Sequence, residues 1–453
     1  MGKVAAVVLA AGKGTRMKSE KAKVLFPLAG RPMLQHIVDI LIEIGVDDIY
    51  TVVGYEAGTV QASIAGPITW VEQREQLGTG HALAQAAAYL GDFPGVVLVL
   101  AGDMPLITEA TLKELLTRHA QEGNAATVLS ARVPDPTGYG RVVRSADGRL
   151  KAIVEEKDAD DRQRQVDEIN SAIYCFDWGR AGALMSRLGR DNAQGEYYLT
   201  EIISLLAGDK DKLGIHVAAD HREVMGINDR VQLAQAEKIL RRRICHKLMR
   251  EGVSVLDPDS TWIDADVRIA RDTTILPNTQ IKGQTTIGGN SVIGPSVTIQ
   301  ASALGEGVCV QYAVLEGATV EDGVSVGPFA YLRPGAVVGR QAKIGDFVEI
   351  KNSRIGPGTK VPHLAYVGDA EVGANSNIGC GVITANYDGA SKQKTTIGDG
   401  VFIGSNANLV APVRVGDNAY VAAGSTVTED VPPRALAIAR TRQTNKADWR
   451  KKD

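Results

Sequence analysis

Aliphatic residues recur at every sixth position through much of the second half of the chain. One run keeps this spacing without a break: Ile263, Ile269, Ile275, Ile281, Ile287, Ile293 and Ile299. A second run is offset from the first by three residues: Val308, Val314, Val320, Val326, Leu332, Val338, Ile344 and Ile350. A period of six suits short β-strands joined by tight turns, with one aliphatic side chain per segment directed at a shared axis. The pattern therefore predicts a coiled, all-β half.

Glycine or asparagine often follows the aliphatic position, where we expect a corner that needs relaxed φ. The glycines are Gly288, Gly294, Gly327, Gly339, Gly345 and Gly404. The repeat resembles the left-handed parallel β-helix of hexapeptide-repeat acyltransferases, and the resemblance supplies the handedness. Proteins of that fold usually form trimers, and a flat-faced coil exposes aliphatic and small residues that one chain cannot cover, so we expect a homotrimer.

The repeat changes phase after Ile350, through Ile355, Val361, Val367, Val372 and Ile378. A polar loop, 386–392, then interrupts it between Ile383 and Ile397. The spacing of six resumes with Ile397, Ile403, Leu409, Val415, Val421 and Val427. A regular coil is by itself equally compatible with a scaffold and with a catalyst, so the interruption marks the place to look for chemistry.

The first half of the chain has a different rhythm. Val4 to Leu9 is an apolar run of strand length, as in a parallel strand covered on both faces, and a glycine-rich turn follows it. Alternating strand and helix patterns continue with a helix from Pro32, a strand at 49–53, a helix at 81–90, a strand at 96–100 and a helix at 112–121. This alternation predicts a doubly wound, Rossmann-like α/β sheet, in which ligands bind beyond the carboxyl ends of the strands.

Residues 229–250 have helical periodicity and predict a connecting helix. The chain therefore divides into an α/β sheet domain at 1–228, the helix at 229–250, a β-helix domain at 251–437 and a basic tail at 438–453. The tail is expected to be solvated, and its basic residues give no function by themselves.

Composition narrows the class of protein. A net charge of −3 over 453 residues, with neither half strongly basic, argues against a nucleic-acid partner. The four cysteines are far apart and show no metal-binding spacing, which fits a reducing cytoplasm. No apolar run approaches the roughly 20 residues of a membrane helix, and the run at 4–11 is too short for a secretory signal, so we expect neither a membrane segment nor a membrane partner.

The turn after the first strand, Leu9 to Met17, is neither a dinucleotide fingerprint nor a Walker loop. Its N–H groups can hold phosphate oxygens, and Lys13, Arg16 and Lys23 can neutralise their charge. The turn resembles the opening motif of sugar-1-phosphate nucleotidylyltransferases. Further motifs of that family follow in order: Lys23-Val24-Leu25, Gln76-Leu77-Gly78-Thr79-Gly80-His81-Ala82, Gly102-Asp103-Met104-Pro105-Leu106 and Gly195-Glu196-Tyr197-Tyr198-Leu199-Thr200.

Nucleotidyl transfer depends on charge neutralisation and in-line positioning, and a hard cation such as Mg²⁺ prefers a carboxylate, a role that suits Asp103. The resemblance adds Asn228 as a second metal ligand and gives Arg16 and Lys23 catalytic roles. It implies that the nucleotide and sugar contact Leu9, Ala10, Ala11, Gly12, Lys23, Gln73, Gly78, Thr79, Ala101, Gly102, Asp103, Gly140, Glu155, Asn170 and Asn228. One departure is Ala22, where the family commonly has proline.

A sheet domain joined to such a repeat resembles the GlmU family of bifunctional N-acetylglucosamine-1-phosphate uridyltransferases and glucosamine-1-phosphate acetyltransferases over essentially the whole chain. The resemblance implies that the sugar phosphate of the acetyl transfer contacts Arg333, Lys351, Tyr366, Asn377 and Lys392. It implies that the co-substrate acetyl-CoA contacts Cys380, Asn386, Tyr387, Ser405, Ala423 and Arg440. Two departures are Cys380, where the family usually has alanine, and Ala365, where a hydroxyl residue is common. Cys380 has no adjacent base and is not a candidate nucleophile.

His363 is the candidate general base of acetyl transfer. It is the one histidine of the repeat, and a side chain with an ordinary pKa of about 6.5 suits the removal of a proton from an attacking amine. A structural histidine after Pro362 is the alternative.

The sequence therefore predicts an enzyme that acetylates glucosamine-1-phosphate with acetyl-CoA and then transfers UMP from UTP to the product, in the synthesis of cell-envelope precursors. Two other interpretations are a nucleotidylyltransferase whose β-helix only oligomerises or senses effectors, and a non-catalytic interaction protein. The glycine turn with Asp103 argues against the second, and His363 with the loop at 386–392 argues against the first.

Overall fold

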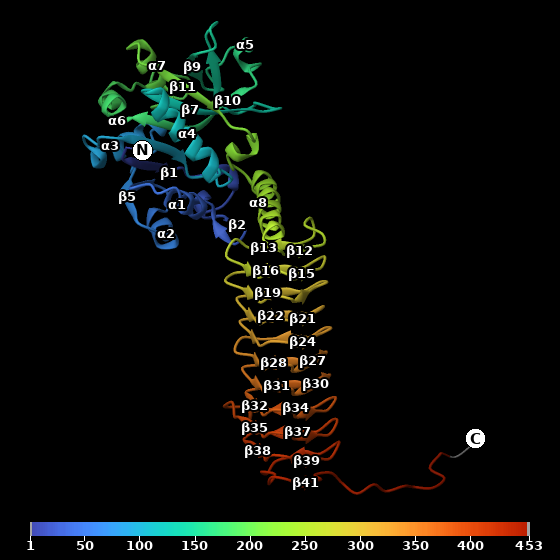
Figure 1. Cartoon of the computed structure of the whole chain (residues 1–453). Coiled ribbons are helices and arrows are strands. Elements are labelled where there is room, and N and C mark those ends of the chain that lie inside the picture. The colour runs from blue at the N-terminus through green and yellow to red at the C-terminus, as the bar shows by residue number, and fades with distance from the viewer. Residues whose placement is uncertain (1, 451–453) are drawn as a thin grey trace. The chain divides into compact units, whose positions relative to one another are not determined.

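The computed structural model describes residues 2–450 (Figure 1). The chain divides into two compact units between Leu240 and Arg241, within helix α8 (Arg230–Arg250). A helix is thus present where the sequence predicts one. In the first unit Ala236 of α8 packs in a small core with Met17 and Phe26, whereas in the second unit Cys245 and Leu248 of the same helix join the core of the repeat.

The first unit is built on a β-sheet with β1 (Val4–Leu9) in its interior. From edge to edge the strands are β11 (Leu213–Val217), β7 (Ala126–Arg132), β10 (Glu168–Asp177), β6 (Val96–Ala101), β1, β4 (Asp48–Val53) and β5 (Ile68–Glu72), and β8 (Arg141–Arg144) with β9 (Leu150–Val154) adjoins β10. β10 runs antiparallel to both of its neighbours β6 and β7, while β1 is parallel to β4 and β6. The Rossmann-like sheet is confirmed, with one reversed strand inside it.

Both faces of β1 are buried, as its unbroken apolar run predicts. Ala6 and Val8 belong to the core on one face, and Ala5 and Val7 belong to the core on the other. The helices of the unit are α1 (Met33–Glu43), α2 (Ala57–Ser63), α3 (Thr79–Leu90), α4 (Glu109–Glu122), α5 (Asp161–Arg164), α6 (Trp178–Ala181) and α7 (Glu201–Gly208). α4 starts three residues before the predicted 112 because the Thr108 side chain accepts a hydrogen bond from the backbone N–H of Thr111 and caps the helix.

The second unit is a parallel β-helix, as predicted (Figure 1). Within residues 251–437 its short strands stack into three sheets. They run from β12 (Ser254–Val255) to β41 (Leu436–Ala437), from β13 (Trp262–Ile263) to β40 (Thr426–Val427), and from β14 (Arg268–Ile269) to β38 (Val413–Val415). Most of these strands direct one aliphatic residue into a continuous core. In β34 (Ile383–Ala385) the buried residue is Thr384, and Ile383 is exposed.

One member of the second aliphatic run is placed wrongly by the spacing of six. Val314 is 38% exposed, and its neighbour Leu315 is fully buried in the core. The inward residues after Ile299 are Leu304, Val310, Leu315 and Val320, so three of these four steps are five residues long. Each of these three steps is one residue shorter than the regular six. Together they account for the offset of three residues between the two runs.

The corner glycines serve two different purposes. Gly294 has a φ of +113°, as the relaxed-φ prediction requires. Gly345 does not have a positive φ. A Cβ there would lie 1.8 Å from the carbonyl oxygen of Pro362 in the next coil, and Gly288, Gly339 and Gly404 are crowded in the same way. For these four positions the φ explanation is wrong, and close packing between coils is the reason for glycine.

The polar interruption is also confirmed. Between β34 (Ile383–Ala385) and β35 (Thr395–Ile397) the chain leaves the coil and returns without disturbing the stack. Asn377 pairs with Phe402 across this excursion, a step of 25 residues compared with 18 from Phe402 to Tyr420. Among residues 2–450, no helix combines the length and apolar character needed to span a bilayer.

The corrected register predicts unequal effects of two neighbouring truncations. Leu315→Ala should destabilise the protein by about 2–5 kcal/mol because it leaves a cavity in the core, whereas Val314→Ala should cost less than about 1 kcal/mol. Urea unfolding followed by circular dichroism at one fixed protein concentration measures both. Equal midpoints for the two variants, or a larger effect at Val314, would contradict this register.

Candidate active sites

The first site lies where β1 and β6 end. The two strands pair in parallel up to Leu9 and Ala101, and the backbone N–H of Gly102 donates to the carbonyl of Leu9 over 2.8 Å. The predicted phosphate turn therefore lies beside the segment that carries Asp103. Ala10 and Ala11 are buried, and Gly12 is exposed with no atom within 4 Å of where a Cβ would lie. Space for a ligand is thus left above the turn.

Charged and polar side chains from three distant segments converge at this edge. The ammonium of Lys23 forms an ion pair with Asp103 and lies 3.2 Å from the side-chain oxygen of Asn228. Arg16 donates to the same Asn228 oxygen over 2.8 Å. The backbone N–H of Ile227 donates to the carbonyl of Asp103 over 3.0 Å, which holds Asn228 beside the carboxylate. The structure therefore brings the two predicted metal ligands and the two predicted catalytic cations together.

These oxygens suit a divalent cation. Asp103 and Asn228 both direct a side-chain oxygen at the Lys23 ammonium, so a positive charge already stands between them. Among the described residues 2–450, no cluster of three or more histidine, cysteine, aspartate or glutamate side chains could enclose a metal ion. A site with one carboxylate and one amide is typical of Mg²⁺, which keeps much of its coordination for water and substrate phosphates.

Gln73, Gly78 and Thr79 form a second group, around the start of α3. Gln73 follows β5 and is only 3% exposed, and its side-chain nitrogen donates to the carbonyl of Gly78 over 3.2 Å. Gly78 has a φ of +112°, and a Cβ there would lie 2.6 Å from the carbonyl oxygen of Tyr197. The Thr79 hydroxyl accepts a hydrogen bond from the backbone of Leu199 over 3.1 Å. These contacts explain why the motifs around Gly78 and Tyr197 occur together.

Gly140, Glu155 and Asn170 form a third group, around β8, β9 and β10. The backbone N–H of Asn170 donates to the carbonyl of Gly140 over 2.8 Å, and the Asn170 amide donates to the hydroxyl of Tyr174 over 2.6 Å. Glu155 accepts from the Thr200 hydroxyl over 3.2 Å, and burial raises the pKa of its carboxyl group. An ordinary surface carboxyl group is not desolvated in this way. A role in a site therefore explains Glu155 better than a simple surface position does.

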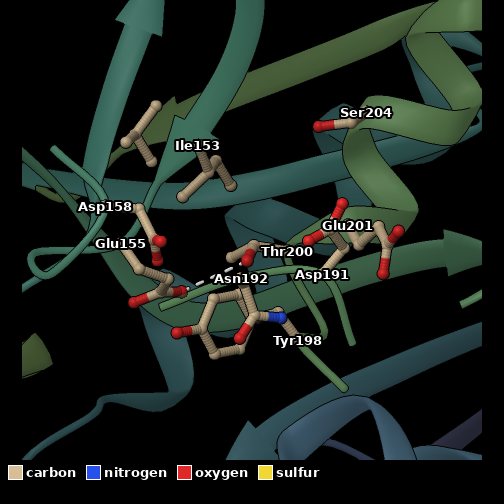
Figure 2. Close-up of a pocket in the computed structure, with 10 residues that line it drawn as sticks. Ile153, Glu155, Asp158, Asp191, Asn192, Tyr198, Thr200, Glu201 and Ser204 are labelled. Carbon is tan, nitrogen blue, oxygen red and sulfur yellow. Dashed lines mark hydrogen bonds between the residues drawn. The ribbon is translucent and has the colours of Figure 1, made fainter. Parts of the chain in front are cut away.

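A cavity of about 280 Å³ adjoins Glu155 (Figure 2). Its polar lining includes Glu155, Asp158, Asn192, Tyr198 and Thr200. The figure shows Glu155 and Thr200 facing each other across the hydrogen bond that joins them. Carboxylates and hydroxyls of this kind suit a ligand rich in hydroxyl groups.

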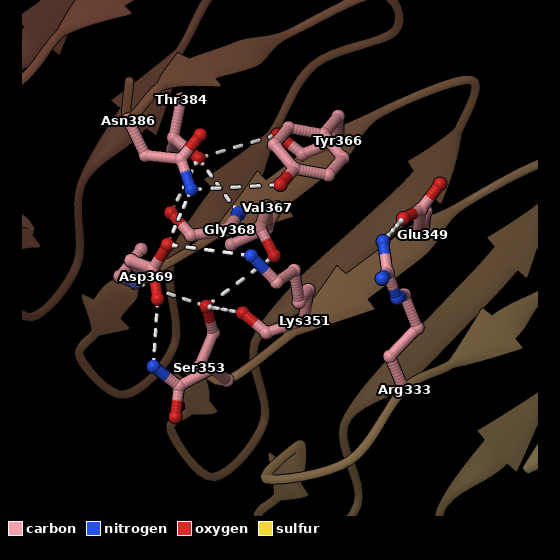
Figure 3. Close-up of polar contacts among 12 residues, drawn as sticks. Arg333, Glu349, Lys351, Ser353, Tyr366, Val367, Gly368, Asp369, Thr384 and Asn386 are labelled. Carbon is pink, nitrogen blue, oxygen red and sulfur yellow. Dashed lines mark hydrogen bonds and ion pairs between the residues drawn. The ribbon is translucent and has the colours of Figure 1, made fainter. Parts of the chain in front are cut away.

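The second site lies on the β-helix, before and within the excursion (Figure 3). Lys351 at the end of β28 (Glu349–Lys351) lies 3.8 Å from the Asp369 carboxylate. The amide of Asn386 donates to the same carboxylate and lies 3.5 Å from the Tyr366 hydroxyl. Figure 3 shows Lys351, Tyr366, Asp369 and Asn386 directed toward one another from successive segments. The structure therefore brings together three of the residues predicted around the break, Lys351, Tyr366 and Asn386, and adds Asp369 to them.

Two lysines meet at this site. The positive charge of nearby Lys351 lowers the pKa of Lys392, because a like charge disfavours the charged form. Two cations are held this close only if something offsets their repulsion, and Asp369 provides part of that charge. Arg333 is engaged separately, because its guanidinium donates to Glu349 over 2.8 Å. Three of the predicted sugar-phosphate contacts are cations. Lys351 and Lys392 form a close pair, whereas Arg333 already has a carboxylate partner.

His363 ends β30 (Lys360–His363), with its side chain about half exposed. Its Nδ1 lies 2.5 Å from an oxygen of Asp346, which ends β27 (Lys343–Asp346), and the hydrogen bond from His363 lowers the pKa of Asp346. Asp346 and His363 are direct partners in the parallel register. The sequence analysis missed Asp346, although it lies 17 residues, one coil, before His363.

The proposed coenzyme contacts fall into two groups. Cys380, Ser405 and Ala423 lie at corners of successive coils, where Gly379 approaches the backbone of Ser405 and Gly404 approaches that of Ala423. Arg440 follows β41, and its side chain lies 4.0 Å from where a Cβ of Gly424 would be. Asn386 and Tyr387 begin the excursion, and the Tyr387 hydroxyl donates to the carbonyl of Gly389 over 2.6 Å. Asn377, which is predicted to contact the sugar phosphate and not the coenzyme, begins β33 (Asn377–Ile378), one coil after Lys360.

Comparison with known proteins agrees with both halves of this description. A MobA-like NTP transferase domain matches residues 6–169, and bacterial transferase hexapeptide repeats match residues 259–301, 317–352 and 394–429. The bifunctional protein GlmU of Brevibacillus brevis is 53% identical and covers 100% of this chain and 98% of that protein. The corresponding values are 49%, 98% and 97% for GlmU of Geobacillus sp. and 50%, 98% and 96% for GlmU of Acetivibrio thermocellus.

An NTP transferase domain followed by a hexapeptide-repeat β-helix defines a two-domain transferase. Near-complete coverage at about half identity narrows this class further. The chain belongs to the bifunctional GlmU family. It is a UDP-N-acetylglucosamine pyrophosphorylase and a glucosamine-1-phosphate N-acetyltransferase, with a role in cell-envelope synthesis, as the sequence predicts. A β-helix that only oligomerises does not agree with this membership.

Proposed function

We propose that uridylyl transfer takes place at the carboxyl ends of β1 and β6. A phosphate oxygen of N-acetylglucosamine-1-phosphate attacks the α-phosphorus of UTP, the bond to the β-phosphate breaks, and pyrophosphate leaves. The observation that supports this location is the convergence of Arg16, Lys23, Asp103 and Asn228. Their charges face the edge where phosphates of the nucleotide would lie.

Each residue group then has a distinct role. The backbone from Leu9 to Gly12 and at Ala101 and Gly102 lines the phosphate edge, and Arg16 and Lys23 neutralise negative charge on the phosphates. Asp103 and Asn228 would hold Mg²⁺ through the two side-chain oxygens that now face the Lys23 ammonium. When bound, Mg²⁺ withdraws negative charge from the phosphates that are being separated.

The two remaining groups divide the ligand between them. Gln73, Gly78 and Thr79 offer an amide and backbone groups, which suit the flat hydrogen-bonding edge of uracil. Gly140, Glu155 and Asn170 offer a carboxyl group, a carbonyl and an amide, which suit the hydroxyl and acetamido groups of the sugar.

Asp103→Asn should lower pyrophosphate release from UTP by about 10²-fold or more, because the amide cannot supply the charge that holds the metal ion. Thiol release from acetyl-CoA by the same preparation should continue at the wild-type rate, since Asp103 lies in the other unit. Both products are measured in parallel in the presence of Mg²⁺. Equal loss of the two activities in a folded variant would identify Asp103 as a structural residue instead.

Acetyl transfer is assigned to the site on the β-helix. Lys351, Lys392 and Arg333 bind the phosphate of glucosamine-1-phosphate, Tyr366 and Asn377 contact the sugar, and the amine attacks the thioester carbonyl of acetyl-CoA. The carbon–nitrogen bond forms, the amine proton passes to Nε2 of His363, and the carbon–sulfur bond breaks. The proton then neutralises the departing thiolate. The observations that support this location are the proximity of Lys351 to Lys392 beside the excursion and the fixing of the His363 ring by Asp346.

Asp346 positions the base. Its carboxylate accepts the Nδ1 proton of His363, which leaves Nε2 as the ring acceptor. Because the pKa of Asp346 is lowered, its charge is present at assay pH and is lost only as the pH falls through that depressed value. Cys380, Asn386, Tyr387, Ser405, Ala423 and Arg440 contact acetyl-CoA in this proposal. A half-buried thiol at Cys380 is small enough to take the place of alanine.

His363→Ala should lower acetyl transfer by about 10²- to 10⁴-fold, the usual contribution of a positioned base. Asp346→Ala should lower kcat by about 10- to 100-fold with little change in KM for glucosamine-1-phosphate, because Asp346 touches the base and not the sugar. Asp346→Asn, which keeps an accepting oxygen, is the matched control and should retain more activity. Near-wild-type acetylation by His363→Ala from pH 6 to 9 would rule out His363 as the base.

A homotrimer is proposed from one exposed apolar row on the β-helix. Tyr312, Phe329 and Phe347 stack on one another with ring centroids 5.7 and 5.2 Å apart, and Leu364 holds the same place one coil further on. These side chains are 44–60% exposed. Burial of such a row against another copy removes a continuous apolar strip from water. Since Leu364 follows His363, the subunit contact would adjoin the acetyl transfer site.

Sedimentation equilibrium should therefore give a mass near three times 48.1 kDa. Phe329→Asp with Phe347→Asp should dissociate the assembly, because two carboxylates would be buried at its contact. Arg268→Asp, on a different sheet, is the surface control and should leave the mass unchanged. A wild-type mass of 48 kDa at micromolar concentration would refute the trimer.

We also propose that the domains are residues 1–228, 229–250, 251–437 and 438–453. Uridylyl transfer and acetyl transfer would then be separable by dividing the chain at α8. A cytoplasmic location is proposed because Cys175, Cys245, Cys309 and Cys380 are all free thiols.

A further inference from the structure

A chain of hydrogen bonds runs from Gln73 into helix α3. The side-chain nitrogen of Gln73 lies 3.2 Å from the carbonyl oxygen of Gly78 and 3.0 Å from Nδ1 of His81. A carbonyl oxygen can only accept, so the group that faces Gly78 must be the amide N–H₂. The second amide hydrogen is then available for Nδ1 of His81.

The His81 ring is fixed in turn. Because Nδ1 accepts from Gln73, the ring proton of the neutral imidazole is on Nε2. The side-chain nitrogen of Gln85 lies 3.1 Å from Nε2, and because Nε2 carries the proton the Gln85 amide has to be turned so that its oxygen accepts there. One face of the ring stacks on Tyr197, with centroids 6.1 Å apart and planes 29° apart. Tyr197 is itself held by backbone hydrogen bonds with Leu77 and Gly80.

The carbonyl oxygen of Gln73 remains available. Among residues 2–450 no donor is hydrogen-bonded to it, although the residue as a whole is 3% exposed. A half-turn of the amide would place this oxygen against the carbonyl oxygen of Gly78, which can only accept. The turned amide would also require the His81 proton to move from Nε2 to Nδ1, so His81 opposes the turn for as long as its proton stays on Nε2. Gln73 thereby presents an acceptor to any ligand beside it.

We infer that His81 is a positioning residue that keeps Gln73 as an acceptor for the N3–H of uracil, and that it thereby sets the preference for UTP over CTP. N3–H is the one donor on the pairing edge of uracil, between two carbonyl acceptors, and cytosine has no hydrogen on N3. A locked acceptor therefore accepts uracil and leaves cytosine with two acceptors facing each other. This inference rests on the proposed contact between Gln73 and the base.

The test measures kcat and KM of pyrophosphate release for UTP, CTP and 3-methyl-UTP, whose methyl group replaces the N3 hydrogen. His81→Phe keeps a flat ring against Tyr197 and removes the acceptor. His81→Asn places an oxygen near the position of Nδ1 and is the matched control. In His81→Phe we expect KM for UTP to rise and the UTP preference in kcat/KM, over both other nucleotides, to fall about tenfold. His81→Asn should keep most of that preference. Acetyl transfer by each preparation reports that the protein is intact.

The possible outcomes distinguish a failure of the His81 role from a failure of the proposed contact between Gln73 and uracil. A wild-type enzyme that uses 3-methyl-UTP as well as UTP would show that Gln73 does not meet N3, and the proposed base contact would fail. A wild-type enzyme that discriminates, with an unchanged preference in His81→Phe, would overturn the role of His81 alone. If His81→Phe does not fold, Gln85→Leu decides: loss of the acceptor for Nε2 should lower the preference about threefold, and an unchanged preference would overturn the inference.

Discussion

Parallel strand pairing is the constraint on which both candidate active sites depend. In the first unit it brings the ends of β1 and β6 to one edge, which places the phosphate turn beside Asp103. In the second unit it stacks each coil on the one before, which places His363 on Asp346. A parallel register aligns residues that are one crossover or one coil apart in sequence. The chemistry in each unit is assembled from such aligned positions.

The sequence predicts much of this architecture because the relevant patterns are strong. The apolar run of β1, the helix at 230–250 and the aliphatic period of the β-helix all appear where expected. The error at Val314 has a simple origin: Val314 and Leu315 are both aliphatic, and hydrophobicity alone cannot tell which one points inward after a short turn. Strand faces alternate at every residue, so a loss of one residue reverses the assignment.

The residues of the candidate sites could be predicted from the sequence where a single local motif identifies them. Asp103 follows a strand and His363 interrupts a repeat, and each is noticed locally. Asp346, Glu349 and Asp369 were missed because a carboxylate in the repeat resembles an ordinary surface residue until its partner is known. His81 was quoted as part of a motif, yet its partners Gln73 and Gln85 become evident only when the side-chain atoms are placed.

The excursion between β34 and β35 shows how a solenoid can gain a new property. Seven or eight additional residues leave at one corner, and the coils on either side keep the same pairing partners that an uninterrupted stack would have. The energetic cost is mainly that of closing a longer loop, which grows slowly with loop length. Corners of this fold are therefore sites at which evolution, or an engineer, can vary substrate selectivity without redesigning the hydrophobic interior.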